Sequence, residues 1–301
     1  MSSQLTVTDD LIESTTPVMQ PPHNRAQGRR ERRTTLLVTG GLILVTLAMV
    51  FPLIWTFMSA TKPLIDAFAS PPKVFYTPTI DAFRSLWLET DFFRFVMNSV
   101  VVGAISVVVT LLIGAPAAYA LSRFGGVTSA VILAVALLFR AIPGFAIMLP
   151  FYDLITRFGL YDTRIGLSIA FIALDMPFTI WLLRNFFAAI PNELDEAAMI
   201  DGCTRWGAFR RIIMPVMGPG LVTASILTFL GAFQSYMLPA VLTDVDAQTA
   251  PVFLAAQVGQ SLPQLQQAAA GIVLLTVPIV FVALVAQRYL VAGLTNGSVK
   301  G

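Results

Sequence analysis

Six stretches of this chain are apolar and long enough to cross a lipid bilayer. A membrane-spanning helix needs about 20 mostly apolar residues, because each residue adds about 1.5 Å toward a hydrocarbon core about 30 Å thick. Lipid offers no partner to a backbone N–H or C=O group, so such stretches form helices, which satisfy these groups internally. The predicted spans are 36–59, 95–121, 127–151, 166–183, 219–239 and 268–290.

The composition agrees with an all-α membrane protein. Of the 301 residues, 56% are apolar and 12% are charged, and the mean hydropathy is +0.78. Average proteins carry about 25% charged residues. The chain therefore has too little polar surface to face water on all sides, and we expect the lipid bilayer to be a partner. The net charge of +2 gives no reason to expect nucleic acid.

Two rare residue types exclude most enzyme chemistry. Cys203 is the only cysteine and His23 is the only histidine. A cysteine metal cluster, a His-based triad and an HExxH-type zinc site are therefore excluded, and the chain has no GxxxxGK[ST] phosphate-binding loop. We expect a protein that is not an enzyme, with no catalytic residue, no metal site and no bound cofactor, so that any ATP is hydrolysed by another chain.

The distribution of positive charge predicts how the spans are oriented. If the N-terminus lies inside, six spans place the C-terminus inside as well. The inner segments then hold twelve of the 19 Lys and Arg residues and the outer segments hold six, while Arg140 lies within the third span. Because inner loops of membrane proteins are richer in Lys and Arg, both termini are predicted to be cytoplasmic.

The segments outside the spans differ in character. Residues 1–35 are polar and predict a disordered cytoplasmic tail, and residues 291–301 predict a short C-terminal cytoplasmic tail. Residues 36–290 form the predicted six-span domain. On the outer side, we expect 61–94 to be irregular with short helices and 244–267 to be a polar loop.

The inner loop 184–218 predicts two short helices joined by a glycine. Acidic residues near its start suit a helix N-terminus, because they lie at the positive end of the helix dipole. Leu194, Ala197 and Ala198 recur at helical spacing and predict one narrow apolar face. Gly202 is predicted to end this helix in the left-handed conformation that favours glycine.

The second short helix is predicted to start at Thr204, whose side chain can cap it. Its apolar face is Trp206, Phe209 and Ile213, arginines occupy the other face, and Pro215 is predicted to stop it. Two short helices with narrow apolar stripes fit a groove on a partner protein. The same pattern fits an amphipathic segment on lipid headgroups, with its arginines on anionic lipid. The residue pattern alone leaves both interpretations open.

A fixed spacing of residues runs through this loop. Glu196-Ala197-Ala198 is followed after three residues by Gly202, and after nine more by Ile212-Ile213-Met214-Pro215. This resembles the EAA signature of ABC importer permeases, which have Leu at the position of Met214. The resemblance implies a type I ABC importer permease fold with six transmembrane helices, in a bacterial or archaeal cell membrane.

The same resemblance implies that the loop docks on a partner ATPase dimer, which binds the ATP and Mg. The residues expected to couple this chain to the ATPase are Glu196, Ala197, Ala198, Asp201, Gly202, Trp206, Phe209, Ile212 and Pro215.

Further segments narrow the resemblance. Ile142-Pro143 with 149–152, the run 159–163 and the terminal run 293–301 are similar to maltose-type sugar importers. This similarity extends from residue 36 to the end. It implies a second, non-identical permease, a pathway formed by the two permeases, and a sugar-like cargo delivered by an extracytoplasmic binding protein.

The fifth span departs from this pattern. Where many relatives carry Trp-Asn-Asp, this chain has Phe233-Gln234-Ser235. A glycerophosphodiester, a polyol or an amino acid therefore stays open as an alternative cargo.

Arg140 and Asp175 are charged residues inside predicted spans. A lone charge at mid-depth costs several kcal/mol unless water or a partner surrounds it. Counted along the spans, the two residues lie at similar depth, so we expect an ion pair between them. Arg140 can also line a water-filled pathway, and the two interpretations can hold together.

Phe233, Gln234, Ser235 and Tyr236 in the fifth span combine aromatic rings with hydrogen-bonding groups, as sugar sites do. Packing between helices explains the same residues equally well. They are therefore candidate cargo contacts with an open structural alternative.

Two other classes of protein compete with an importer permease. A secondary transporter would need intramembrane carboxylates for proton or sodium coupling, and only Asp175 qualifies. An intramembrane enzyme would need a nucleophile with a base, and the spans contain no such set. The sequence therefore favours the importer permease.

Overall fold

The computed structural model describes residues 25–67 and 69–295, and every regular element in those ranges is a helix. The chain divides into two compact units, Met1–Pro52 and Leu53–Gly301. The elements are α1 (Arg25–Thr61), α2 (Leu64–Ala67), α3 (Asp81–Glu89), α4 (Phe92–Arg123), α5 (Val127–Ala141), α6 (Gly144–Arg157), α7 (Arg164–Ala188), α8 (Glu193–Ile200), α9 (Arg205–Ala208), the π-helix η1 (Phe209–Ile213), α10 (Met214–Val216), α11 (Gly218–Gln234), α12 (Met237–Leu242), α13 (Ala250–Gln257) and α14 (Leu262–Thr295).

Each predicted tail, 1–35 and 291–301, lies partly within the residues that the structure describes. Residues 1–24 and 296–301 lie outside the described residues. Residues 25–35, expected to be disordered, are helical and belong to α1. This part of the prediction is wrong because the segment is free of proline and contains five arginines, a residue type that favours a helix. Residues 291–295 likewise belong to α14.

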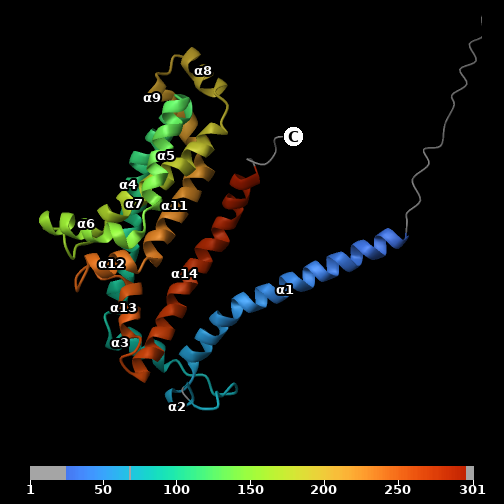
Figure 1. Cartoon of the computed structure of the whole chain (residues 1–301), viewed down its shortest axis with the longest axis vertical. Helices are drawn as coiled ribbons and strands as arrows, with labels where there is room; N and C mark the ends of the chain where they lie inside the picture. The colour runs from blue at the N-terminus through green and yellow to red at the C-terminus, as the bar shows by residue number, and fades with distance from the viewer. Residues whose placement is uncertain (1–24, 68, 296–301) are drawn as a thin grey trace, which may run out of the picture. The chain divides into compact units, whose positions relative to one another are not determined.

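The larger unit contains a bundle of long helices, shown in Figure 1. α4 packs against α7 and α11, and α14 packs against α11, α13 and α3. Gly103 of α4 allows a close approach to α11, since a Cβ there would lie 2.9 Å from the ring of Phe229. α8 and α9 lie at one end of this bundle, called the inner end below, and α3 and α13 lie toward the other, the outer end.

Four helical segments are each long and apolar enough to cross a membrane: Thr35–Thr61 of α1, α4, α7 and Leu262–Val285 of α14. Two more spans are reached if each of two bent helix pairs counts as one, namely α5 with α6 and Arg205–Val216 with α11. The predicted all-α membrane fold is confirmed, with four unbroken spans among the described residues and up to six in total.

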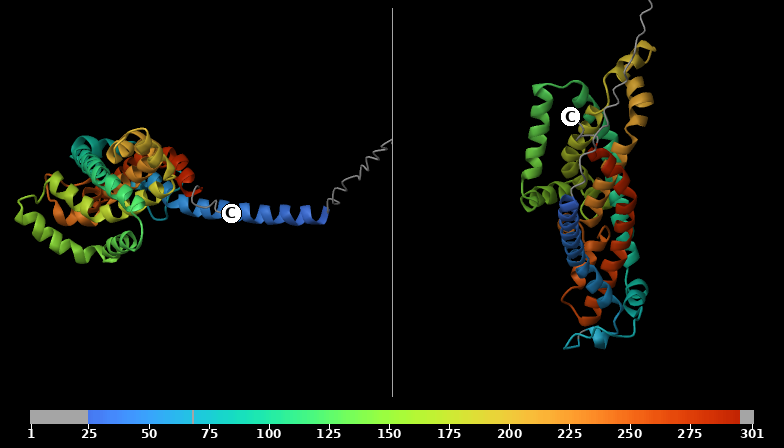
Figure 2. Two further views of the ribbon diagram at one scale, coloured as in Figure 1. Left: turned by 90° about the horizontal axis from the view of Figure 1, so that it is seen from above. Right: turned by 90° about the vertical axis from the view of Figure 1, so that its right-hand side faces the viewer.

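The third predicted span is not one straight helix. α5 ends at Ala141, and α6 begins at Gly144 with its axis bent by 93°, a turn that Figure 2 shows clearly. The cause lies in Pro143, which pushes the preceding residue out of the helical region. Ile142 accordingly has φ −67° and ψ 131°.

The fifth predicted span, 219–239, also ends early. α11 stops at Gln234, because Ser235 is extended with φ −67° and ψ 135°, and the short α12 follows. The outer segment 244–267, expected to be a loop, contains α13 and the start of α14. Leu254 of α13 packs closely on α14, where a Cβ on Gly271 would lie 2.3 Å from its side chain.

The fourth predicted span is longer than expected. α7 runs unbroken from Arg164 to Ala188 with Pro177 inside it. Its length carries it past the predicted end of the span at residue 183 and leads directly into the inner loop.

Candidate functional site

The inner loop contains the turn that its sequence predicts. Gly202 has φ +86°, its N–H donates to Met199 O at 3.1 Å, and the N–H of Cys203 donates to Ala198 O at 3.0 Å. These two bonds make a Schellman motif, which satisfies the last carbonyls of a helix and requires a left-handed residue. Gly202 therefore ends α8 as predicted.

The second helix starts as predicted but ends differently. The hydroxyl of Thr204 accepts a hydrogen bond from the Gly207 N–H at 3.1 Å, which caps α9. Pro215 does not stop the helix, which continues through η1 to Val216 before a bend of 75°. In η1 the Met214 N–H donates to Phe209 O, five residues back. This wider turn makes room for the proline ring, which would clash with an ordinary helical turn.

The predicted coupling residues divide between two faces of the loop. Phe209 is buried and Ile212 is partly buried in a core cluster with α4, α7 and α11, and Ala198 of α8 is also buried. The other predicted coupling residues point outward, and Trp206 is 60% exposed although its ring packs 5.0 Å from that of Phe209. The exposed set is Glu196, Ala197, Asp201, Gly202, Trp206 and Pro215.

A buried carboxylate anchors the loop to the end of α4. Asp195 is only 8% exposed, its Oδ2 lies 2.8 Å from Arg123 Nε in an ion pair, and its Oδ1 accepts a short hydrogen bond from the Tyr119 hydroxyl. Leu194, which the helical pattern placed on one narrow apolar face with Ala197 and Ala198, is 38% exposed, whereas Ala198 is 1% exposed. The apolar pattern missed Asp195 because a carboxylate can be buried where a cation and a hydroxyl receive it.

Arg123 also reaches the end of α7. One of its terminal nitrogens donates to Phe187 O at 3.2 Å and to Ile190 O at 3.0 Å. The Tyr119 ring packs against the rings of Phe187 and Phe209, with centroids 5.6 Å and 4.9 Å apart. The inner ends of α4 and α7 and the two loop helices are therefore joined by one cluster.

The outward surface beside this cluster mixes acidic and apolar side chains. Ile200 is 86% exposed and Met199 is 41% exposed, next to the exposed carboxylates of Glu196 and Asp201. A hollow of about 460 Å³ lies between the end of α4 and the loop helices, and its lining includes both Asp195 and Glu196.

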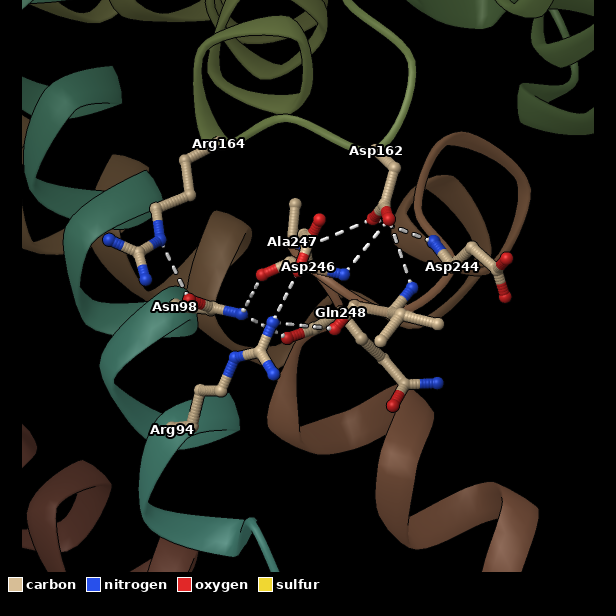
Figure 3. A network of polar contacts seen from close by, with 9 residues as sticks. Arg94, Asn98, Asp162, Arg164, Asp244, Asp246, Ala247 and Gln248 are labelled. Atoms are coloured by element: carbon tan, nitrogen blue, oxygen red, sulfur yellow. Dashed lines mark hydrogen bonds and ion pairs between the residues drawn. The ribbon is translucent and has the colours of Figure 1, made fainter.

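A second polar network lies at the outer end, shown in Figure 3. Asp162, in the turn before α7, accepts hydrogen bonds of 2.9 to 3.0 Å from the backbone N–H groups of four consecutive residues, 244 to 247. Asp162 itself has φ +53°. Its partial burial raises the pKa of the carboxyl, but these four donors outweigh that effect and hold the pKa below its ordinary value.

Residues from α4 complete this outer network. Asn98 is fully buried and donates to Asp246 O at 2.9 Å and Gln248 O at 2.8 Å, while its own carbonyl accepts from Arg164 Nε at 2.8 Å. Arg94 pairs with the carboxylate of Asp246 at 2.7 Å. The sequence singled out the run 159–163 as a resemblance but gave no role for Asp162, because its partners are backbone groups.

The predicted ion pair within the spans is present. Arg140 lies 3.1 Å from Asp175, and its guanidinium lies 4.7 Å from the ring centre of Phe178. Both charged residues line a hollow of about 870 Å³ between α5, α6 and α7, with mostly apolar walls. The Arg140 side chain remains 44% exposed, so the pair is open on one side.

The candidate cargo residues of the fifth span lie elsewhere. Phe233 and Gln234 line a separate hollow of about 320 Å³ with α13 and α14. Phe233 is 3% exposed and stacks on Phe229, with 5.5 Å between the ring centroids, whereas Tyr236 is 49% exposed. The structure thus does not bring these residues into one hollow with Arg140 and Asp175.

Within residues 25–67 and 69–295, no three His, Cys, Asp or Glu side chains come together in a way that could hold a metal ion.

The chain is similar in sequence and in fold to known proteins. Residues 110–296 match the family described as binding-protein-dependent transport system inner membrane component. The chain is 35% identical over 275 residues to the trehalose transport system permease protein SugB of Mycobacterium tuberculosis, covering 90% of this chain and 99% of that one. It is 30% identical over 279 residues to the diacetylchitobiose uptake system permease protein NgcG of Streptomyces coelicolor, covering 92% of each.

A solved structure has the same fold. It is a chain of a bacterial ABC transporter involved in the import of the acidic polysaccharide alginate, with a TM-score of 0.74 and 23% identity, covering 87% of this chain and 98% of that chain.

Proposed function

The chain belongs to the family of inner membrane components of binding-protein-dependent transport systems, and on this premise we propose that it forms half of the pathway for a sugar or short oligosaccharide. It is a transport subunit and not an enzyme, and it is a multi-pass protein of the inner membrane. A second, homologous permease completes the pathway, an extracytoplasmic binding protein delivers the cargo, and an ATPase dimer supplies the energy and binds the ATP and Mg.

The observation that supports this proposal most strongly is the structure of the inner loop, residues 184–218. Its Schellman turn at Gly202 presents an exposed acidic and apolar surface, while Asp195 and Phe209 fix its other face to the spans. A short helix with an exposed apolar stripe suits a groove on a partner. Lipid contact is a poorer fit, because Glu196 and Asp201 stand beside the exposed Ile200. The partner is then the ATPase, and the loop and both termini are cytoplasmic.

The cargo class rests on relatives and on the hollows within the spans. The two curated relatives named above carry trehalose and diacetylchitobiose in their names. Arg140 and Asp175 bring charge into a large hollow that is open on one side and otherwise mostly apolar, and a charged pair at this depth is best explained by a polar pathway, so we assign them to it. Phe233, Gln234, Ser235 and Tyr236 add aromatic and hydrogen-bonding groups beside α13 and α14, and we assign them a supporting role in cargo contact.

Uptake in cells tests this function. A strain that lacks the gene is complemented with the wild-type chain or an empty vector, and import of labelled trehalose, diacetylchitobiose and an amino acid is measured. Restored import of a sugar by the wild-type chain alone is the expected result. Restored amino acid import without sugar import would overturn the cargo class, and unchanged import of all three in the deletion strain would overturn their assignment to this permease.

A further inference from the structure

The helix α8 has an inward face that docking on a partner does not use. Asp195 and Ala198 lie on this face, and Asp195 is 8% exposed and Ala198 1%. Within the described residues, the polar side-chain contacts of α8 with the spans all run through the Asp195 carboxylate, to Arg123 and Tyr119 of α4.

A buried carboxylate is costly unless a cation and hydrogen bonds receive it. Here both partners come from one face of α4, because Tyr119 and Arg123 are four residues apart and lie one turn from each other. The side chains of the ion pair are 10% and 11% exposed. This degree of burial protects the pair from screening by water and salt, so α8 is held firmly to α4.

Arg123 extends the connection to a second span. Its contacts with Phe187 O and Ile190 O hold the last turn of α7 to the same guanidinium that receives Asp195. The backbone links of α8 are turns, one at 189–192 and one around Gly202. The chain itself joins α8 only to α7 and to α9, so the side-chain cluster gives α8 a connection to α4 that the backbone does not provide.

We propose that Asp195, Arg123 and Tyr119 form a coupling strut. They are positioning residues that transmit the displacement of α8, imposed by the partner ATPase, to α4 and α7, whose movement opens and closes the pathway. This inference rests on the proposed docking of α8. It adds that docking alone does not drive transport: without the strut, α8 moves with the ATPase while the spans lag behind.

The test uses the complete importer, this chain with its partner permease, the ATPases and the cargo-loaded binding protein, reconstituted in lipid vesicles. Three quantities are measured: the ATPase retained on the permease, basal ATP hydrolysis, and the molecules of labelled sugar, trehalose or diacetylchitobiose, transported per ATP hydrolysed. In Asp195→Asn and Tyr119→Phe, retention and basal hydrolysis should stay near wild type. Transport per ATP should fall by about tenfold in Asp195→Asn, as for the loss of a hydrogen bond to a charged group, and by less in Tyr119→Phe.

Two controls separate the strut from folding and from docking. Arg123→Gln combined with Asp195→Asn removes both charges, so neither is left unpaired, and the complex should assemble while transport per ATP stays low. Normal transport per ATP in this double variant would overturn the strut. Glu196→Gln on the outward face should instead lower ATPase retention. An ATPase that does not bind even the wild-type chain would refute the proposed function itself, and the strut with it.

Discussion

Two carboxylates, one on each side of α7 in the sequence, tie loops to helix ends by different means. Asp162, before α7, accepts hydrogen bonds from four backbone N–H groups of the outer segment 244–247. Asp195, after α7, pairs with two long side chains, Arg123 and Tyr119, that project from α4. The contacts of Asp162 thus fix the backbone conformation of one loop, whereas the contacts of Asp195 join separate helices.

This difference suggests different tasks. Four backbone donors that converge on one carboxylate hold residues 244–247 in one conformation, so Asp162 fixes the outer loop against the turn before α7. A side-chain cluster between helices passes force from one helix to another. A substitution of Asp162 should therefore affect only the outer loop, whereas a substitution of Asp195 or Arg123 should lower transport.

The largest effect is expected for Arg123→Ala. This change leaves Asp195 buried without its cation and frees two carbonyls at the end of α7, a class of change that costs about 3 to 5 kcal/mol. The thermal unfolding midpoint of the detergent-purified chain should fall well below that of a matched exposed variant, Arg157→Ala. Equal midpoints for the two variants would show that the inner cluster carries little stability.

A smaller effect is expected for Gly202→Val. No atom lies within 4 Å of a Cβ built at this position, so the cost comes from φ +86° alone, on the order of 1 to 3 kcal/mol for a β-branched residue. Transport and cargo-stimulated ATP hydrolysis should fall while the chain still inserts. Gly202→Asn, which tolerates the left-handed region better, serves as the control and should retain more activity. Equal activity of the two variants would contradict a fixed turn.

Asp162→Asn should act locally at the outer end. The amide keeps an acceptor oxygen but loses the charge that binds four N–H groups, at a cost of about 1 to 3 kcal/mol. Hydrogen exchange of the amides of 244–247 should rise while that of α8 stays unchanged. Faster exchange in α8 as well would mean that the contacts of Asp162 and those of Asp195 are not independent.

Low pH should weakly reproduce the faster amide exchange of 244–247 that is expected for Asp162→Asn. Because the pKa of Asp162 is lowered in the folded chain, its contribution to stability is present above the ordinary pKa of about 3.9 and is lost as the pH falls further, through the folded pKa. Amide exchange at 244–247, corrected for the intrinsic effect of pH, should therefore increase only below about pH 4. The Asp162→Asn variant, which cannot titrate there, should show no such step.

Features that depend on neighbouring residues can be predicted from the sequence. The spans were found because length and hydropathy are local properties, and Gly202 and Thr204 were found because turns and caps have their own residue preferences. The Arg140–Asp175 pair was found because depth can be counted along a helix.

Other features depend on partners distant in the sequence. The helical pattern predicted one apolar face of Leu194, Ala197 and Ala198 and gave no role to Asp195, but the structure buries Asp195, because α4 brings Tyr119 and Arg123 to that position. The role of Asp162 was hidden because its partners are backbone groups of a loop 82 to 85 residues away. The break of the third span follows from Pro143, a local signal in the sequence that hydropathy over the whole span does not reveal.

The central claim, that the inner loop is cytoplasmic and docks on an ATPase, is tested most directly at Cys203. It is the only cysteine, it is partly exposed, and it lies between α8 and α9. A membrane-impermeant maleimide should label it in inside-out vesicles but not in intact cells, and bound ATPase should slow the labelling. A Cys203→Ser, Val245→Cys variant, whose outer site is exposed, should show the opposite sidedness. Labelling of Cys203 in intact cells, or a rate that the ATPase leaves unchanged, would contradict the account.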